Sequence, residues 1–160
     1  MHKKYVFILM LLICIGPLGC SDNPVNNRTE DLTAAPDIVL EDLSEIVAIR
    51  YNQVILIKEE NLLVKFRDIT EGRCPIGVHC FWEGQAIGDF LLIKPGEGRA
   101  IARPIIRAST DPDSYDLELA DEALGYRLFL TELNPYPHIE IPTDPKNYIA
   151  KLRIEKLPED

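Results

Sequence analysis

From residue 53 onward, apolar and polar side chains alternate in short runs that predict β-strands. Residues 62–69 read LLVKFRDI, so Leu62, Val64 and Phe66 share one face of an extended chain. Residues 147–157 repeat the pattern with Tyr148, Ala150, Leu152 and Ile154. Further strands are expected at 53–58, 86–94, 99–109 and 125–133. Such strands are half buried, with one face on a core.

The segments between these runs predict turns and loops. Residues 95–98 read PGEG and predict a hairpin turn. Pro104 cannot donate a ladder hydrogen bond, so its strand should lie at an edge or carry a bulge. Residues 109–116 and 134–145 are rich in proline and aspartate and predict loops. Residues 117–124 predict a short helical turn.

Six to eight strands at this spacing favour an all-β fold, an antiparallel β-sandwich. An immunoglobulin-like sandwich is the first choice, with one disulfide-stapled loop. We expect the domain to occupy residues 43–160, which is enough chain to bury a core.

The first nineteen residues predict a secretory signal peptide. Lys3 and Lys4 precede an apolar run at residues 5–15, and Gly16 and Pro17 end it. A run of this length is too short to span a bilayer, which needs about 20 apolar residues.

Leu18-Gly19-Cys20 follows the apolar run and resembles the lipobox of bacterial lipoproteins. The resemblance implies a lipidated Cys20 that anchors the chain to the bacterial cell membrane, inner or outer, on the extracytoplasmic side. The alternative is an ordinary signal peptide that leaves Cys20 as a spare thiol. Residues 20–42 are polar and contain two prolines, which predicts a flexible tether.

The mature chain is strongly acidic. Removing residues 1–19 leaves 15 basic against 26 acidic residues, a formal charge of −11. This charge disfavours nucleic acid and anionic lipid as partners, because both are negatively charged. We expect a partner that is an envelope protein or another extracytoplasmic ligand.

Residues 72–86, GRCPIGVHCFWEGQA, hold the densest candidate chemistry. With Cys14 and Cys20 used elsewhere, Cys74 and Cys80 remain, and an oxidising compartment favours a disulfide between them. A zinc site would combine them with His79, and only His138 could supply a fourth ligand, so no metal is predicted. A catalytic thiolate is disfavoured because the second cysteine would oxidise it.

Four residues form a candidate binding surface: Phe81, Trp82, Tyr136 and His138. Trp82 has two interpretations, as a core residue that covers the disulfide, which we expect, or as an exposed anchor. Tyr136 lies between two prolines, which suits either a loop packed on the sheet, the preferred interpretation, or a rigid binding surface.

The cysteine segment also resembles a known pattern. Arg73-Cys74-Pro75, Cys80-Phe81-Trp82 and Gly84-Gln85-Ala86 are similar to the Arg-Cys-Pro...Cys-x-Trp-x-Gly-x-Ala motif of an uncharacterised family of small secreted bacterial proteins. The similarity extends to the strand at 62–69, to Leu133-Asn134-Pro135-Tyr136-Pro137 and to the last strand. The resemblance implies a disulfide-bearing β-domain and supplies no activity.

Other candidate chemistry is weaker. Four acidic residues between 111 and 118 carry oxygen ligands of the kind that calcium prefers: Asp111, Asp113, Asp116 and Glu118. We nevertheless expect this segment to be a solvated acidic loop. No catalytic residue, nucleophile motif, phosphate loop or cofactor site is predicted.

We therefore expect a lipid-anchored envelope module without catalytic activity that serves in binding or assembly. One alternative is an envelope hydrolase whose acidic residues converge in the fold. The other is an inhibitor that presents the Cys74–Cys80 loop to an enzyme.

Overall fold

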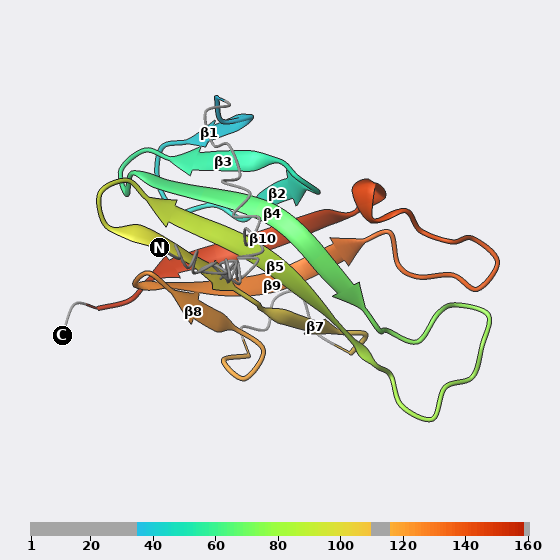
Figure 1. The fold of residues 1–160 in the computed structure, drawn as a ribbon. Helices are drawn as coiled ribbons and strands as arrows, with labels where there is room; N and C mark the ends of the chain where they lie inside the picture. Colours follow the sequence, from blue (N-terminus) through green and yellow to red (C-terminus); the bar gives the residue numbers. More distant parts are fainter. Residues whose placement is uncertain (1–34, 110–115, 159–160) are drawn as a thin grey trace, which may run out of the picture. The chain divides into compact units, whose positions relative to one another are not determined.

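The computed structural model describes residues 35–109 and 116–158. These residues form two β-sheets that pack face to face (Figure 1). The first sheet has the order β1-β3-β4-β5-β6, and β7 also pairs with β5. Its strands are β1 (Ile38–Leu40), β3 (Val54–Ile57), β4 (Leu62–Glu71), β5 (Gln85–Lys94), β6 (Gly98–Ala102) and β7 (Ile105–Arg107).

The second sheet has four strands in the order β2-β10-β9-β8. Its strands are β2 (Val47–Arg50), β8 (Asp121–Ala123), β9 (Tyr126–Asn134) and β10 (Ile149–Lys156). All pairings are antiparallel except that of β1 with β3. A short 3-10 helix, η1 (Pro145–Asn147), precedes β10. The predicted antiparallel β-sandwich is thereby confirmed.

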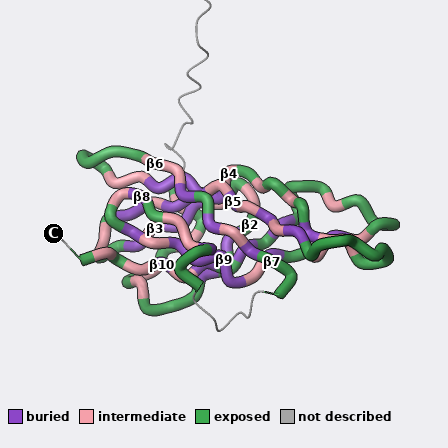
Figure 2. Tube along the Cα trace, turned by 90° about the horizontal axis from the view of Figure 1, so that it is seen from below, coloured by how far each residue is buried: buried purple, intermediate pink, exposed green. Residues whose placement is uncertain are grey.

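The core lies between the sheets and uses the faces that the alternation predicts. Leu62, Val64 and Phe66 of β4 are fully buried, and Phe66 stacks on Phe90 of β5 with ring centroids 4.9 Å apart. Figure 2 shows buried positions along the middle of the strands and exposed positions in the loops. Burying each such large apolar side chain stabilises the fold by about 1.5–3 kcal/mol.

Residues 35–109 and 116–158 form ten strands, more than the predicted six to eight, and three of them, β1, β7 and β8, have only three residues. The expected helical turn at 117–124 is wrong for its second half, which forms β8. Leu124 and Gly125 both have positive φ and make a two-residue turn that pairs Ala123 with Tyr126. Pairing with β9 therefore overrides the local helix preference of the segment.

The predicted tether at 20–42 contains β1, so the ordered domain begins earlier than residue 43. The Asp37 carboxylate accepts a hydrogen bond from the Val54 N–H at 2.8 Å, and Ile38 and Leu40 pack against the core. A three-residue strand has too little alternation to stand out in sequence.

Two details of the strands follow from backbone hydrogen bonding. Pro104 lies at the break between β6 and β7, which both pair with β5, so the predicted edge or bulge is confirmed. On β9, Phe129 and Thr131 are buried although they alternate with Leu128 and Leu130, which are also buried. The register shifts there, because Glu132 pairs with Lys151 while Leu130 pairs with Leu152, which leaves Thr131 as an extra residue.

Candidate binding tip

Two loops adjoin at one end of the sandwich, and we call them the tip: residues 72–84, between β4 and β5, and residues 135–144, between β9 and η1 (Figure 1). Backbone hydrogen bonds join them. The Ile76 N–H donates to the Pro137 carbonyl at 2.9 Å, and the Ile139 N–H donates to the Ile76 carbonyl at 3.1 Å. The loops therefore form one surface although the fifty residues 85–134 separate them in the sequence.

The tip gathers exposed apolar side chains. Six of the ten large apolar side chains that are exposed within residues 35–109 and 116–158 belong to it. They are Ile76, Val78, Phe81, Trp82, Ile139 and Ile141. Phe81 is 105% exposed and Trp82 is 66% exposed. Such a gathering is typical of an interaction surface, whereas single exposed apolar residues are ordinary.

The predicted disulfide between Cys74 and Cys80 is confirmed. Trp82 is exposed and so is not the core residue that we expected, because its loop lies beyond the ends of β4 and β5. The Cys74 N–H donates to the Glu83 carbonyl at 2.8 Å and closes the neck of the loop. Gly84 completes this neck with φ of 71°, and a Cβ there would lie 2.0 Å from the Gly72 carbonyl oxygen.

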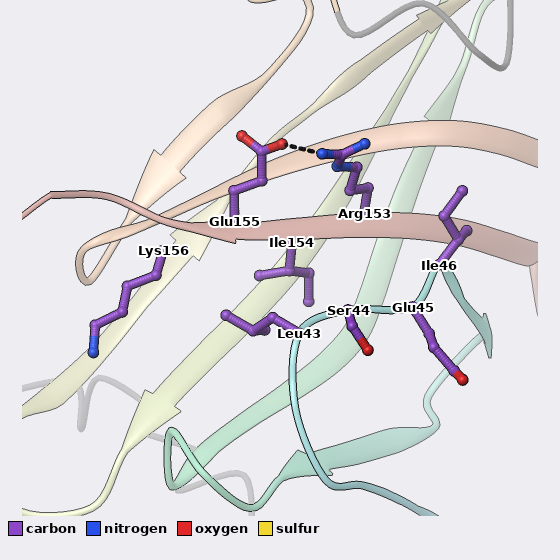
Figure 3. Close-up of a pocket in the computed structure, with 8 residues that line it drawn as sticks. All are labelled: Leu43, Ser44, Glu45, Ile46, Arg153, Ile154, Glu155 and Lys156. Atoms are coloured by element: carbon purple, nitrogen blue, oxygen red, sulfur yellow. Dashed lines mark ion pairs between the residues drawn. The ribbon is translucent and has the colours of Figure 1, made fainter.

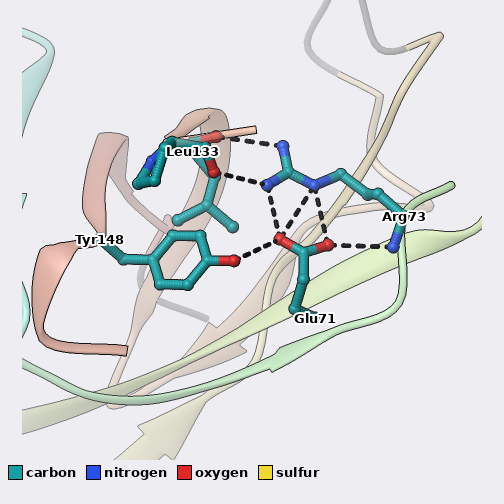
Figure 4. Close-up of polar contacts among 5 residues, drawn as sticks. Glu71, Arg73, Leu133 and Tyr148 are labelled. Carbon is teal, nitrogen blue, oxygen red and sulfur yellow. Dashed lines mark hydrogen bonds and ion pairs between the residues drawn. The ribbon is translucent and has the colours of Figure 1, made fainter. Parts of the chain in front are cut away.

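Arg73 anchors the tip to both sheets. Its side chain is buried, and its guanidinium donates to the Glu71 carboxylate, with the shortest nitrogen–oxygen distance at 2.6 Å (Figure 4). The same group donates to the Leu133 carbonyl at 3.0 Å and lies 4.6 Å from the centroid of the Tyr136 ring. One side chain thus joins the end of β4, the end of β9 and the second loop.

Tyr148 completes the network below the tip. Its hydroxyl donates to the Glu71 carboxylate at 3.0 Å, while Arg73 occupies the same carboxylate from the other side (Figure 4). Burial, followed by the charge and hydrogen bond of Glu71, raises the pKa of the Tyr148 phenol. The phenol therefore stays protonated and remains a donor across the neutral pH range.

The four predicted surface residues all lie in the tip, with different roles. Phe81 and Trp82 are exposed. Tyr136 is half buried against Arg73, which agrees with the packed loop expected for it. His138 is also half buried, and its Nδ1 accepts the Glu140 N–H at 3.1 Å, so this imidazole shapes its own loop.

Sequence reasoning missed the residues that hold the tip and four of its six exposed apolar side chains. Glu71 and Arg73 are two positions apart, which places them on one side of an extended chain and could have indicated an ion pair. Ile139 and Ile141 alternate with polar residues in a proline-bounded loop, and that pattern resembles a strand more than a binding surface.

A hollow of about 200 Å³ adjoins the tip. Its lining includes Ile69 and Glu71 of β4, Tyr148, and Pro137, His138 and Ile141 of the tip. Both Glu71 oxygens already accept hydrogen bonds from Arg73, and one also accepts the Tyr148 hydroxyl. The polar floor of the hollow is thus satisfied from within, and its walls are largely apolar.

A wider groove of about 500 Å³ lies between residues 43–46 and β10 (Figure 3). Leu43 and Ile154 form its base, while Arg153 and Glu155 pair at 2.9 Å along its rim. Lys156 forms an ion pair with Glu60, with its Nζ 3.1 Å from the Glu60 carboxylate. The charges of β10 along this groove are therefore matched within the chain.

In the described part of the chain, no group of three or more His, Cys, Asp or Glu residues could hold a metal ion. Asp116 uses its carboxylate locally, accepting the Glu118 N–H at 2.9 Å. Asp111 and Asp113 lie outside the described residues, as do Cys14 and Cys20.

No helix within residues 35–109 and 116–158 has the length and apolar character needed to cross a membrane. No family model, curated protein or solved structure matches this chain.

Proposed function

We propose that this protein is a lipid-anchored module of the bacterial envelope, held to the membrane through Cys20, that binds a partner through the tip. Its task is binding or assembly rather than catalysis. The anchor rests on the sequence pattern at residues 18–20, which lies outside the described residues.

The observation that carries this proposal is the gathering of exposed apolar side chains on two braced loops. Exposed Phe81 and Trp82 are the residue types that dominate binding energy in protein interfaces. The disulfide and buried Arg73 hold the loops in place, so binding would cost little ordering entropy.

The test is recovery of envelope proteins on the full chain, purified in detergent and immobilised. The variant Phe81→Ser/Trp82→Ser is expected to lose the bound partner, because it removes both exposed aromatic side chains of the tip. Leu117→Ser is the matched control, since Leu117 is 62% exposed but belongs to another loop. Equal recovery on all three proteins would reject the tip as the binding surface.

An inhibitor is a special case of the same module, favoured by the protruding loop between Cys74 and Cys80 (Figure 1). It requires that loop to enter the active site of an envelope or secreted enzyme in a fixed shape. Inhibition should then fall when the disulfide is reduced, and inhibition that survives full reduction would exclude this form of the proposal.

A hydrolase is a second candidate, favoured by the hollow that brings His138 and Glu71 together. Against it, both Glu71 oxygens already accept hydrogen bonds from Arg73, so the carboxylate is engaged within the chain rather than directed at a substrate. Turnover of chromogenic ester or glycoside substrates by the wild type, lost in His138→Gln, would support it. The binding proposal expects no turnover by either protein.

A further inference from the structure

We infer that the partner of the tip is a protein segment with a large apolar side chain flanked by basic residues, and that this side chain enters the hollow beside the tip. The inference rests on the proposed function, since it specifies what the tip binds. Three observations carry it.

The first is continuity between the apolar surface and the hollow. Ile141 is exposed on the tip and also lines the hollow, together with Pro137 and Ile69. The volume of about 200 Å³ suits one large side chain rather than a small-molecule ligand of ordinary size, whose sites are roughly 300–1,000 Å³. A recess within an apolar patch is where interfaces place their anchoring side chain.

The second is the polar floor of the hollow. The Glu71 carboxylate is already bound by Arg73 and by the Tyr148 hydroxyl. An entering side chain therefore needs to supply no hydrogen bond, and an apolar one loses nothing by lacking a donor. This favours an aliphatic or aromatic side chain over a charged one in the hollow itself.

The third is the charge around the patch. Residues 71–84 and 134–147 contain four acids and two bases, for a formal charge of −2. Glu83, Glu140 and Asp144 belong to no ion pair within residues 35–109 and 116–158. Basic residues beside the anchor would complement these acids, which speeds encounter and selects among partners.

The same charges argue against other occupants. An anionic lipid surface would be repelled by these acids and by the formal charge of −11 on the mature chain. A second copy related by a two-fold axis would bring the same acids face to face. A basic protein segment is the occupant that the apolar and charged groups favour together.

The experiment is photo-crosslinking in cells that make the full chain with its own leader. Phe81→p-benzoylphenylalanine places the reactive group on the tip, and Leu117→p-benzoylphenylalanine is the control on another exposed loop. Mass spectrometry of the adduct is expected to identify a protein segment with Lys or Arg next to the crosslinked apolar residue. The control position should not give that adduct.

Charge is tested in the crosslinking background with Glu140→Lys, which is expected to lower the yield about fivefold. Glu59→Lys is the matched control, because Glu59 is also exposed but lies between β3 and β4. A lipid adduct, an adduct with a second copy, or a protein adduct that is insensitive to Glu140→Lys would overturn the inference and leave tip binding intact. No adduct at position 81 would overturn the proposed function itself.

Discussion

At the scale of single residues, Arg73 matters most for the tip. It is 5% exposed and reaches Glu71, the Leu133 carbonyl and the Tyr136 ring. A planar guanidinium can make all these contacts at once, which a lysine ammonium cannot. Arg73 therefore couples the geometry of both loops to the ends of two strands in different sheets.

Removing the guanidinium should destabilise the domain. For Arg73→Met we expect a loss of about 3 kcal/mol in the free energy of unfolding, because Glu71 and the Leu133 carbonyl lose their donor in a buried setting. The measurement is urea unfolding followed by far-ultraviolet circular dichroism, which reports on the β-sheets. Arg103→Met removes an exposed arginine paired with Asp89 at 3.1 Å and should cost less than about 1 kcal/mol. Similar losses in both variants would contradict a structural role for Arg73.

The raised pKa of Tyr148 makes a prediction about alkaline pH. Its phenol binds its proton more tightly in the folded state, so its stabilising contribution is complete below the unfolded pKa of about 10. Above that pH the unfolded state loses the proton first, and the contribution falls as pH rises. The difference in unfolding free energy between wild type and Tyr148→Phe should therefore stay constant up to neutral pH and shrink as the pH rises above about 10. A constant difference would show that the phenol is not held protonated by the fold.

Sequence reasoning found Phe81, Trp82, Tyr136 and His138 from their residue types and flanking prolines, and all four lie in the tip. It could not place Trp82 at the surface, because burial depends on whether the loop lies over the core or past its edge. Arg73 was missed as an anchor because two of its partners, Leu133 and Tyr136, are sixty or more residues away.

At the scale of elements, strands with several alternating residues could be predicted, because alternation is local. The strands β4, β5, β9 and β10 lie where the pattern predicts them, to within about two residues at each end. The short strands β1 and β8 form because the longer strands β3 and β9 pair with them. No local sequence pattern therefore predicts them. The extra residue in β9, Thr131, likewise arises from the pairing of β9 with β10.

The neck of the first loop gives a prediction about backbone geometry. Gly84→Ala should destabilise the domain by about 3 kcal/mol or more, because the new Cβ would meet the Gly72 carbonyl oxygen at 2.0 Å. Gly96→Ala is the matched control, since Gly96 has a similar positive φ of 86° and no atom within 4 Å of the added Cβ. It should cost only about 1–2 kcal/mol, the backbone strain alone. Thermal unfolding of both variants separates the clash from the strain, and equal costs would refute the close approach.

The disulfide gives a second prediction at this scale. Cys74→Ser/Cys80→Ser should lower the free energy of unfolding by about 2 kcal/mol, the loop-closure entropy of a seven-residue ring. The fold should persist, because Arg73 and the backbone bonds to Pro137 and Glu83 remain. Chymotrypsin cleavage after Phe81 or Trp82 should become faster than in the wild type. Unchanged cleavage would show that the other contacts alone fix the loop.

At the scale of the whole molecule, the chain combines an acidic β-sandwich, an apolar tip and the proposed lipid anchor. The sandwich class could be predicted because many short alternating runs with turn residues between them fit few architectures. The joining of two distant loops into one surface could not, because it depends on strand order. The order of the strands in each sheet is set by the packing of the whole core rather than by any one segment.

The anchor makes the last prediction. Cys20→Ser should move the protein from the membrane to the soluble extracytoplasmic fraction, because acyl chains contribute about 0.8 kcal/mol per buried methylene and none would be attached. Cys14→Ser is the control, since Cys14 lies within the expected signal peptide. Fractionation with a metabolic fatty-acid label measures both effects. Retention of Cys20→Ser at the membrane without label would mean that another part of the protein holds it there.

The closed neck at Gly72 and Gly84 separates the evolution of the tip from that of the sandwich. Ile76, Val78, Phe81 and Trp82 are all exposed, so new side chains at these four positions would leave the hydrophobic interior untouched. Selection could therefore replace the recognition sequence while the scaffold stayed constant, and a designer could do the same by substituting these four side chains.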